Sequence, residues 1–114
     1  KSERTLCYDV KTGVLEMTDT IDDGRCRYHE NGLVHDFQSR NVYTIREGDP
    51  LSAQVQCERE VEVSRGDWQT RVETSSMMTA DADNFFLANA VIAYEGDRLV
   101  FKREWKRSIP RRMI

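Results

Sequence analysis

Apolar and polar side chains alternate along much of the chain. In residues 53–63 glutamine or glutamate occupies every second position, and the positions between them include Val55, Cys57, Val61 and Val63. Residues 68–78 alternate in the same way. A period of two residues is typical of a β-strand with one side buried and the other side in water. We therefore predict two neighbouring strands here, joined by the segment SRGDW at residues 64–68.

Turn-forming residues, mostly glycine close to aspartate or asparagine, interrupt the alternation at regular intervals. They lie at residues 11–13, 22–24, 31–32, 47–50, 65–67, 80–83 and 95–97. The runs between them predict an all-β protein, in which residues 1–114 form a single domain with an antiparallel meander of about eight strands. Such a sheet buries one face by curling, so we expect a half-open barrel or a bent sandwich.

One run is apolar on both sides. In residues 84–95, Phe86 and Ile92 share one parity while Phe85 and Val91 share the other. This pattern predicts a central strand that is covered on both faces. The curled sheet itself or a partner protein would have to supply the second cover.

Two turn segments carry further information. The RGD tripeptide in residues 64–68 matches an adhesion motif, but Gly66 supplies a positive φ and Asp67 accepts backbone hydrogen bonds, so we interpret it as a hairpin turn without an adhesive role. In residues 46–53, Pro50 interrupts the hydrogen-bond ladder. We predict an internal break in the sheet there.

Charge argues against one class of function. The net charge is -3 and the isoelectric point is about 5.4, whereas nucleic-acid binding usually requires a basic surface. Charge is nevertheless uneven, because seven lysines or arginines follow residue 97 and Glu104 is the one acid there. We interpret this region as a solvated strand face with a basic tail; a docking surface for an acidic partner is the alternative.

The three cysteines, Cys7, Cys26 and Cys57, cannot all pair, and none belongs to a Cys-x-x-Cys motif. Buried free thiols in a reducing cytoplasm are therefore expected. No run of about 18 apolar residues occurs, so no membrane-spanning segment is predicted. Because the first residue is lysine rather than methionine, we expect a piece of a longer protein.

Catalytic, cofactor-binding and metal-binding residues are all predicted to be absent. The Gly-x-Ser-x-Gly motif of α/β-hydrolases does not occur. A two-residue turn at Asn31-Gly32 would place His29 and His35 on opposite faces, which disfavours a shared zinc ion. Asp81 and Asp83 lie in a turn, where hydrogen bonding to the backbone explains them better than calcium does.

Carboxylates on a predicted strand follow the same alternation. Glu58, Glu60 and Glu62 form one row that faces solvent, and we expect it to lie opposite Gln69 and Arg71 on the next strand.

Several short motifs recur in a recognisable order in residues 43–111. They are DPLSA at residues 49–53, RGDW at 65–68, a T-D-x-x-x-F-like stretch at 79–85, AYEG at 93–96 and W...IPR at 105–111. In this respect the chain resembles the C-terminal part of bacterial serine hydrolases of the cocaine-esterase and X-Pro dipeptidyl-peptidase superfamily, known as CocE/NonD hydrolases. It departs from them at Arg111-Arg112, where relatives often carry an acid.

The resemblance implies a parent enzyme whose Ser-His-Asp triad lies upstream. On this hypothesis the chain is a non-catalytic accessory β-domain with a packing or oligomerisation role. Its expected partners are the upstream catalytic domain and, in a homodimer, a second copy. The alternative is a stand-alone curled sheet that holds a small apolar ligand between Trp68, Trp105, Phe86 and Ile92. An enzyme in its own right is the third and least favoured hypothesis.

Overall fold

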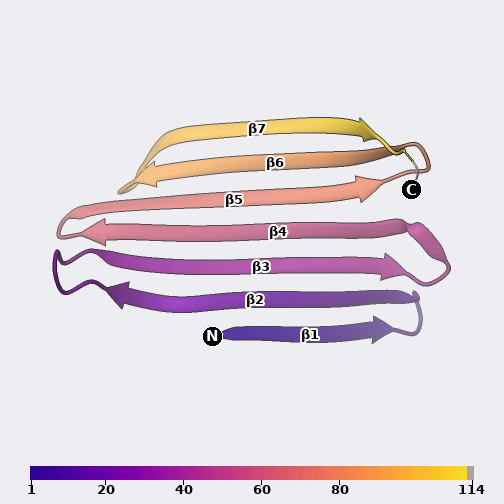
Figure 1. Cartoon of the computed structure of the whole chain (residues 1–114), viewed down its shortest axis with the longest axis horizontal. Helices are drawn as coiled ribbons and strands as arrows, with labels where there is room; N and C mark the ends of the chain where they lie inside the picture. The colour runs from indigo at the N-terminus through magenta and orange to yellow at the C-terminus, as the bar shows by residue number, and fades with distance from the viewer. Residues whose placement is uncertain (113–114) are drawn as a thin grey trace.

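Seven strands form one antiparallel sheet in which the order of the strands follows the sequence (Figure 1). The computed structural model describes residues 1–112. The strands are β1 (Ser2–Asp9), β2 (Val14–Arg27), β3 (Val34–Arg46), β4 (Asp49–Arg65), β5 (Trp68–Ala80), β6 (Asn84–Glu95) and β7 (Arg98–Pro110). The all-β antiparallel meander expected from the alternation is therefore confirmed.

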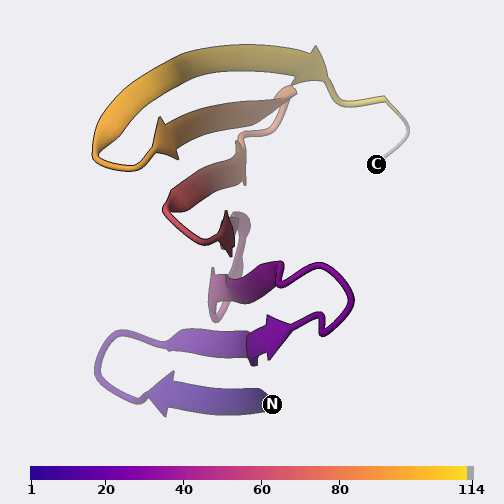
Figure 2. The ribbon, with the colours of Figure 1, turned by 90° about the vertical axis from the view of Figure 1, so that its left-hand side faces the viewer.

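The sheet is a single open layer. Each strand pairs only with its neighbours in the sequence, so β1 and β7 form two free edges, and the sheet neither closes into a barrel nor folds into a sandwich. Figure 2 shows the layer from the side: β1 and β2 run across the view, the middle strands are seen nearly end-on, and β7 arches at the top. The layer is thus twisted and curled, because the right-handed twist of each strand accumulates across the sheet.

The structure has seven strands rather than eight because residues 22–24 form a β-bulge instead of a turn. The pairing of β2 with β3 shifts between Asp22 and Gly24, and β2 continues to Arg27. Gly24 adopts a φ of 71°, and its N–H donates a hydrogen bond of 2.9 Å to Asp22 Oδ1. An extra residue accommodated by a left-handed glycine is typical of a bulge.

The SRGDW segment is a hairpin turn, as predicted. Arg65 pairs with Trp68, and Gly66 between them has a φ of 59°. The predicted break near Pro50 is wrong, because β3 and β4 remain paired as far as Arg46 and Asp49. Pro50 is accommodated there beside a shift in the register of that pairing, where an irregular ladder does not require its missing N–H.

A single layer leaves no hydrophobic core. Among residues 1–112 no apolar side chain is buried, and the one residue that is buried is Ser39, with 6% of its surface exposed. The cysteines are free, but their predicted burial is wrong, since Cys7 and Cys26 are exposed and Cys57 is half-buried. Both sides of β6 likewise lack a covering layer within the described chain. No helix in that range is long and apolar enough to cross a membrane.

Candidate functional site

The register of the sheet collects most apolar side chains on one side, which we name the apolar face. Directly opposed residues of neighbouring strands point to the same side. One such row crosses six strands, and its members are Leu6, Met17, Tyr43, Val55, Met78 and Leu87. A second apolar row, nearer the other end of the strands, contains Phe37, Val61, Val72, Ala93 and Phe101.

A polar row, which we name the central belt, separates these two apolar rows. It consists of Arg4, Asp19, Asn41, Cys57, Ser76 and Asn89. Arg4 forms an ion pair of 2.6 Å with Asp19, and Ser76 Oγ forms a hydrogen bond of 2.6 Å with Asn89 Oδ1. The Oδ1 atom of Asn41 is shielded from solvent and has no hydrogen-bond partner. The apolar face therefore has two apolar patches with a polar stripe between them.

The first apolar patch contains a hollow of 380 Å³. Its floor and walls are made by side chains of β1 to β6, among them Leu6, Leu15, Met17, Val55, Met78 and Phe85. These side chains present almost no polar atoms to the hollow, so it suits an apolar group.

The four residues that the sequence suggested as a ligand pocket do not come together. Trp68 and Trp105 lie on the apolar face, whereas Phe86 and Ile92 lie on the opposite side of the sheet. That expectation is wrong, because the register of the strands directs two of the four side chains to each side of a single layer.

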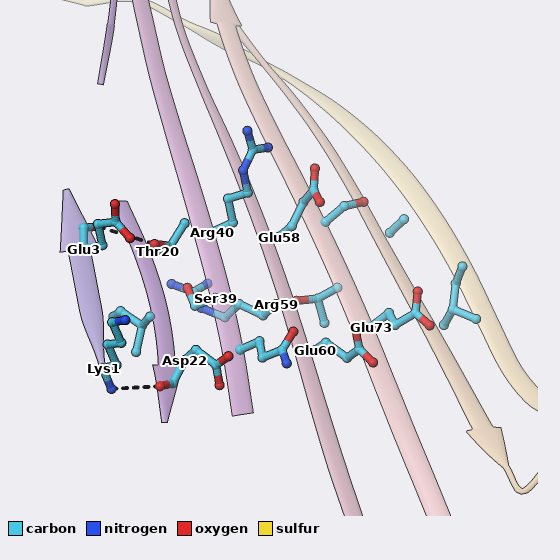
Figure 3. Close-up of a pocket in the computed structure, with 16 residues that line it drawn as sticks. Lys1, Glu3, Thr20, Asp22, Ser39, Arg40, Glu58, Arg59, Glu60 and Glu73 are labelled. Carbon is cyan, nitrogen blue, oxygen red and sulfur yellow. Dashed lines mark hydrogen bonds between the residues drawn. The ribbon is translucent and has the colours of Figure 1, made fainter. Parts of the chain in front are cut away.

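The opposite side of the sheet, which we name the acidic face, is rich in carboxylates. Figure 3 shows a hollow of 620 Å³ on this face, where Glu58, Glu60 and Glu73 extend from β4 and β5. Arg40 on β3 and the N-terminal Lys1 lie along the same hollow. Arg59 borders the hollow as well, although its register with Thr74 directs its side chain to the other side of the sheet. The acidic face is therefore charged, in contrast to the apolar face.

The predicted row of glutamates is present, but its expected partners are only partly correct. Glu62 pairs with Arg71 as expected, whereas Glu60 lies opposite Glu73 and Gln69 pairs with Ser64. Partial burial raises the pKa of Glu60 above its ordinary value, and the charges of Glu73 and then Glu62 raise it further. Like charges that lie opposite each other on neighbouring strands repel. An acidic partner surface docked on this face would therefore add to the repulsion.

The histidines lie differently from the geometry that the sequence suggested. His29 lies outside the strands, in a turn of residues 28–33, whereas His35 lies in β3 and pairs across the strands with Cys26. Within residues 1–112 no group of three or more histidine, cysteine, aspartate or glutamate side chains is placed to hold a metal ion.

The aspartates near residue 81 organise the turn between β5 and β6. Asp81 Oδ1 accepts hydrogen bonds of 2.8 Å from the backbone N–H groups of both Asp83 and Asn84. Backbone hydrogen bonding by Asp81 is what the turn interpretation predicted.

Comparison with protein-family models, with curated proteins and with solved structures gave no match for this chain. The geometry of the sheet itself is thus the basis for a functional proposal. Its most distinctive feature is a broad apolar face that no other part of the described chain covers.

Proposed function

We propose that the chain is a non-catalytic accessory β-domain of a longer serine hydrolase of the CocE/NonD kind, and that it packs its apolar face against the rest of that protein. Two independent features support the proposal. One is the uncovered apolar face, and the other is the resemblance of residues 43–111 to the C-terminal part of such hydrolases. The proposed role is structural, since the triad chemistry of the parent enzyme would come from upstream residues.

The absence of a buried apolar core in residues 1–112 is the observation that carries the proposal. Apolar side chains in soluble domains are normally withdrawn from water, and a sheet generally needs a second layer to be stable. Here large apolar side chains on one face remain open to solvent, including Leu6, Tyr8, Trp68 and Met78. An exposed apolar surface of this extent marks a site of contact with another protein surface.

The size of the face fits a stable interface. Strands of about 13 residues that rise about 3.3 Å per residue and lie about 4.8 Å apart give seven strands a face of about 1,200 Å². A stable protein interface needs about 800 Å² on each side. The apolar face therefore has enough area for one permanent contact.

Hydrolysis of p-nitrophenyl esters tests the proposal. We expect no turnover by the purified 114-residue chain, and turnover by the complete protein that its reading frame encodes. Alanine in place of the serine of an upstream Gly-x-Ser-x-Gly motif should abolish that activity. Turnover by the pure chain, or a reading frame that encodes no such motif, would contradict the proposal.

The hollow on the apolar face favours a second candidate function, the binding of a small apolar ligand. Its volume of 380 Å³ lies within the usual range of small-molecule sites, and its lining is almost wholly apolar. Under this alternative, a fluorescent fatty acid should bind the monomeric chain with one defined stoichiometry. Under the accessory-domain proposal, we expect weak binding without saturation, because the hollow would be one part of a larger docking surface.

A further inference from the structure

Charge is divided unevenly between the two faces of the sheet. On the apolar face, Asp19 is neutralised by Arg4, with 2.6 Å between Asp19 Oδ1 and Arg4 Nε. Glu95, near the end of β6, is neutralised by Arg98 at 2.9 Å. These two acids are therefore unavailable to the other arginines of the apolar face.

Besides Arg65 at the end of β4, three strand arginines of the apolar face form no ion pair within residues 1–112. Arg59 and Arg103 belong to one cross-strand row, which passes through Thr74 and Val91, and Arg107 pairs across the strands with Leu87 of the first apolar row. None of the three forms an ion pair in the described chain. The guanidinium of Arg103 lies 5.5 Å from the centre of the Trp105 ring, so this cation is held over the apolar face.

Cations on the acidic face are matched differently. Lys102 lies 3.8 Å from Glu104, and Arg71 lies 2.9 Å from Glu73. Arg40 and Lys106 form no ion pair there either, but the carboxylates of the acidic face outnumber its cations, so the net positive charge lies on the apolar face. The chain as a whole carries a net charge of -3, so this separation of charge is invisible in the composition.

We propose that the partner of the apolar face is a protein surface that is itself apolar and carries carboxylates, which pair with Arg59, Arg103 and Arg107. The inference rests on the proposed docking function and adds the chemistry of the partner. Complementary charge across an interface selects the partner and its orientation. If the apolar faces of two copies of the chain met, their arginines would face each other with no unpaired carboxylate between them. A second copy of the chain is therefore a poor partner for this face.

Two designed amphipathic helical peptides with the same leucine face provide the test. One carries glutamates at its polar positions and the other carries lysines. We expect the chain to bind the glutamate peptide about tenfold more tightly, which is the size that three partly exposed ion pairs supply. This preference opposes the net charge of the chain. It should weaken as salt is added, because ions screen exposed charges.

A matched pair of triple variants locates the effect. Arg59→Gln, Arg103→Gln and Arg107→Gln together should remove the preference for the glutamate peptide. Arg40→Gln, Lys102→Gln and Lys106→Gln remove the same charge from the acidic face and should leave the preference in place. The triple lysine variant at positions 59, 103 and 107 should also keep it, and circular dichroism checks that every variant retains its strands.

The possible failures are distinguishable. If neither peptide binds, the apolar face is not a docking surface and the proposed function fails with the inference. If both peptides bind equally, if the lysine peptide binds more tightly, or if the two triple glutamine variants behave alike, docking stands and its acidic partner does not. A stable dimer of the chain that excludes both peptides would also overturn the inference, since the partner would then be a second copy.

Discussion

Met78→Lys should sharply reduce the binding of an uncharged, solvent-sensitive dye such as Nile red to the chain. Met78 lines the apolar hollow and is 40% exposed, so a lysine places a charge in the middle of the first apolar patch without displacing a buried side chain. We expect a loss of about 1 to 2 kcal/mol, which is about five- to thirtyfold in affinity. A fluorescence titration at constant protein concentration measures it.

Met77→Lys is the matched control. Met77 is adjacent in the sequence but pairs with Gln56 and Ala88, which places it on the acidic face. The two substitutions add the same charge and remove the same side chain, so the faces of the sheet alone distinguish them. Equal losses of dye binding in the two variants would contradict the assignment of an apolar face.

The alternation of side chains made the strands predictable. Val55, Val61 and Val63 share one side and Glu58 shares the other with Glu62, as residues 53–63 indicated. This succeeds because burial on one face of a strand imposes a period of two on the sequence. The open layer was not predictable in the same way, because the alternation shows that a face is apolar but does not show what covers it.

Residues 28–33 show why the candidate site was harder to predict than the strands. The Asn31-Gly32 pair suggested a two-residue turn, but Asn31 Oδ1 accepts a hydrogen bond from Leu33 N–H, and Gly32 N–H donates to Tyr28 O. The resulting turn is longer, and it brings His35 opposite Cys26. The longer turn thus set the cross-strand neighbour of His35, which the letters Asn31-Gly32 alone did not determine.

The docking surface escaped notice in the sequence for a related reason. Arg59, Arg103 and Arg107 are far apart along the chain, and they share a face only through the pairing of β4 to β7. The excess of basic residues after residue 97 did suggest an acidic partner as an alternative. It could not show that Arg103 and Lys102 lie on different faces of the sheet. The register of the strands assigns them to different faces, because neighbouring residues of a strand point to opposite sides.

Residues 22–24 present the same ambiguity in another form, because an aspartate before a left-handed glycine is equally suited to a turn and to a bulge. The partner strand decides between them: Asp22 pairs with Gln38 and Gly24 with Phe37, which are adjacent in β3. Asp23 is therefore the extra residue, and the ladder on either side of it is continuous. The bulge keeps the apolar positions of β2 on the correct face over its whole length.

Deletion experiments follow from this assignment, with opposite outcomes at two exposed acids. Deletion of Asp23 removes the extra residue and leaves every cross-strand pair in place, so we expect a loss of less than about 1 kcal/mol in the free energy of unfolding. Deletion of Glu58 in β4 moves either Val61 and Val63, or Val55 and Cys57, off the apolar face and turns charged or amide side chains onto it. That change should cost more than about 3 kcal/mol and prevent folding.

Urea denaturation followed by circular dichroism measures both deletions, and binding of the glutamate peptide checks whether the apolar face survives. The variant that lacks Asp23 should bind the peptide as tightly as the unaltered chain does, because Arg59, Arg103 and Arg107 remain on the apolar face. A chain that tolerates the loss of Glu58 as readily as the loss of Asp23 would show that its strands can slip past one another. In that case side-chain parity would not define a fixed docking surface, since the same residues would face either side.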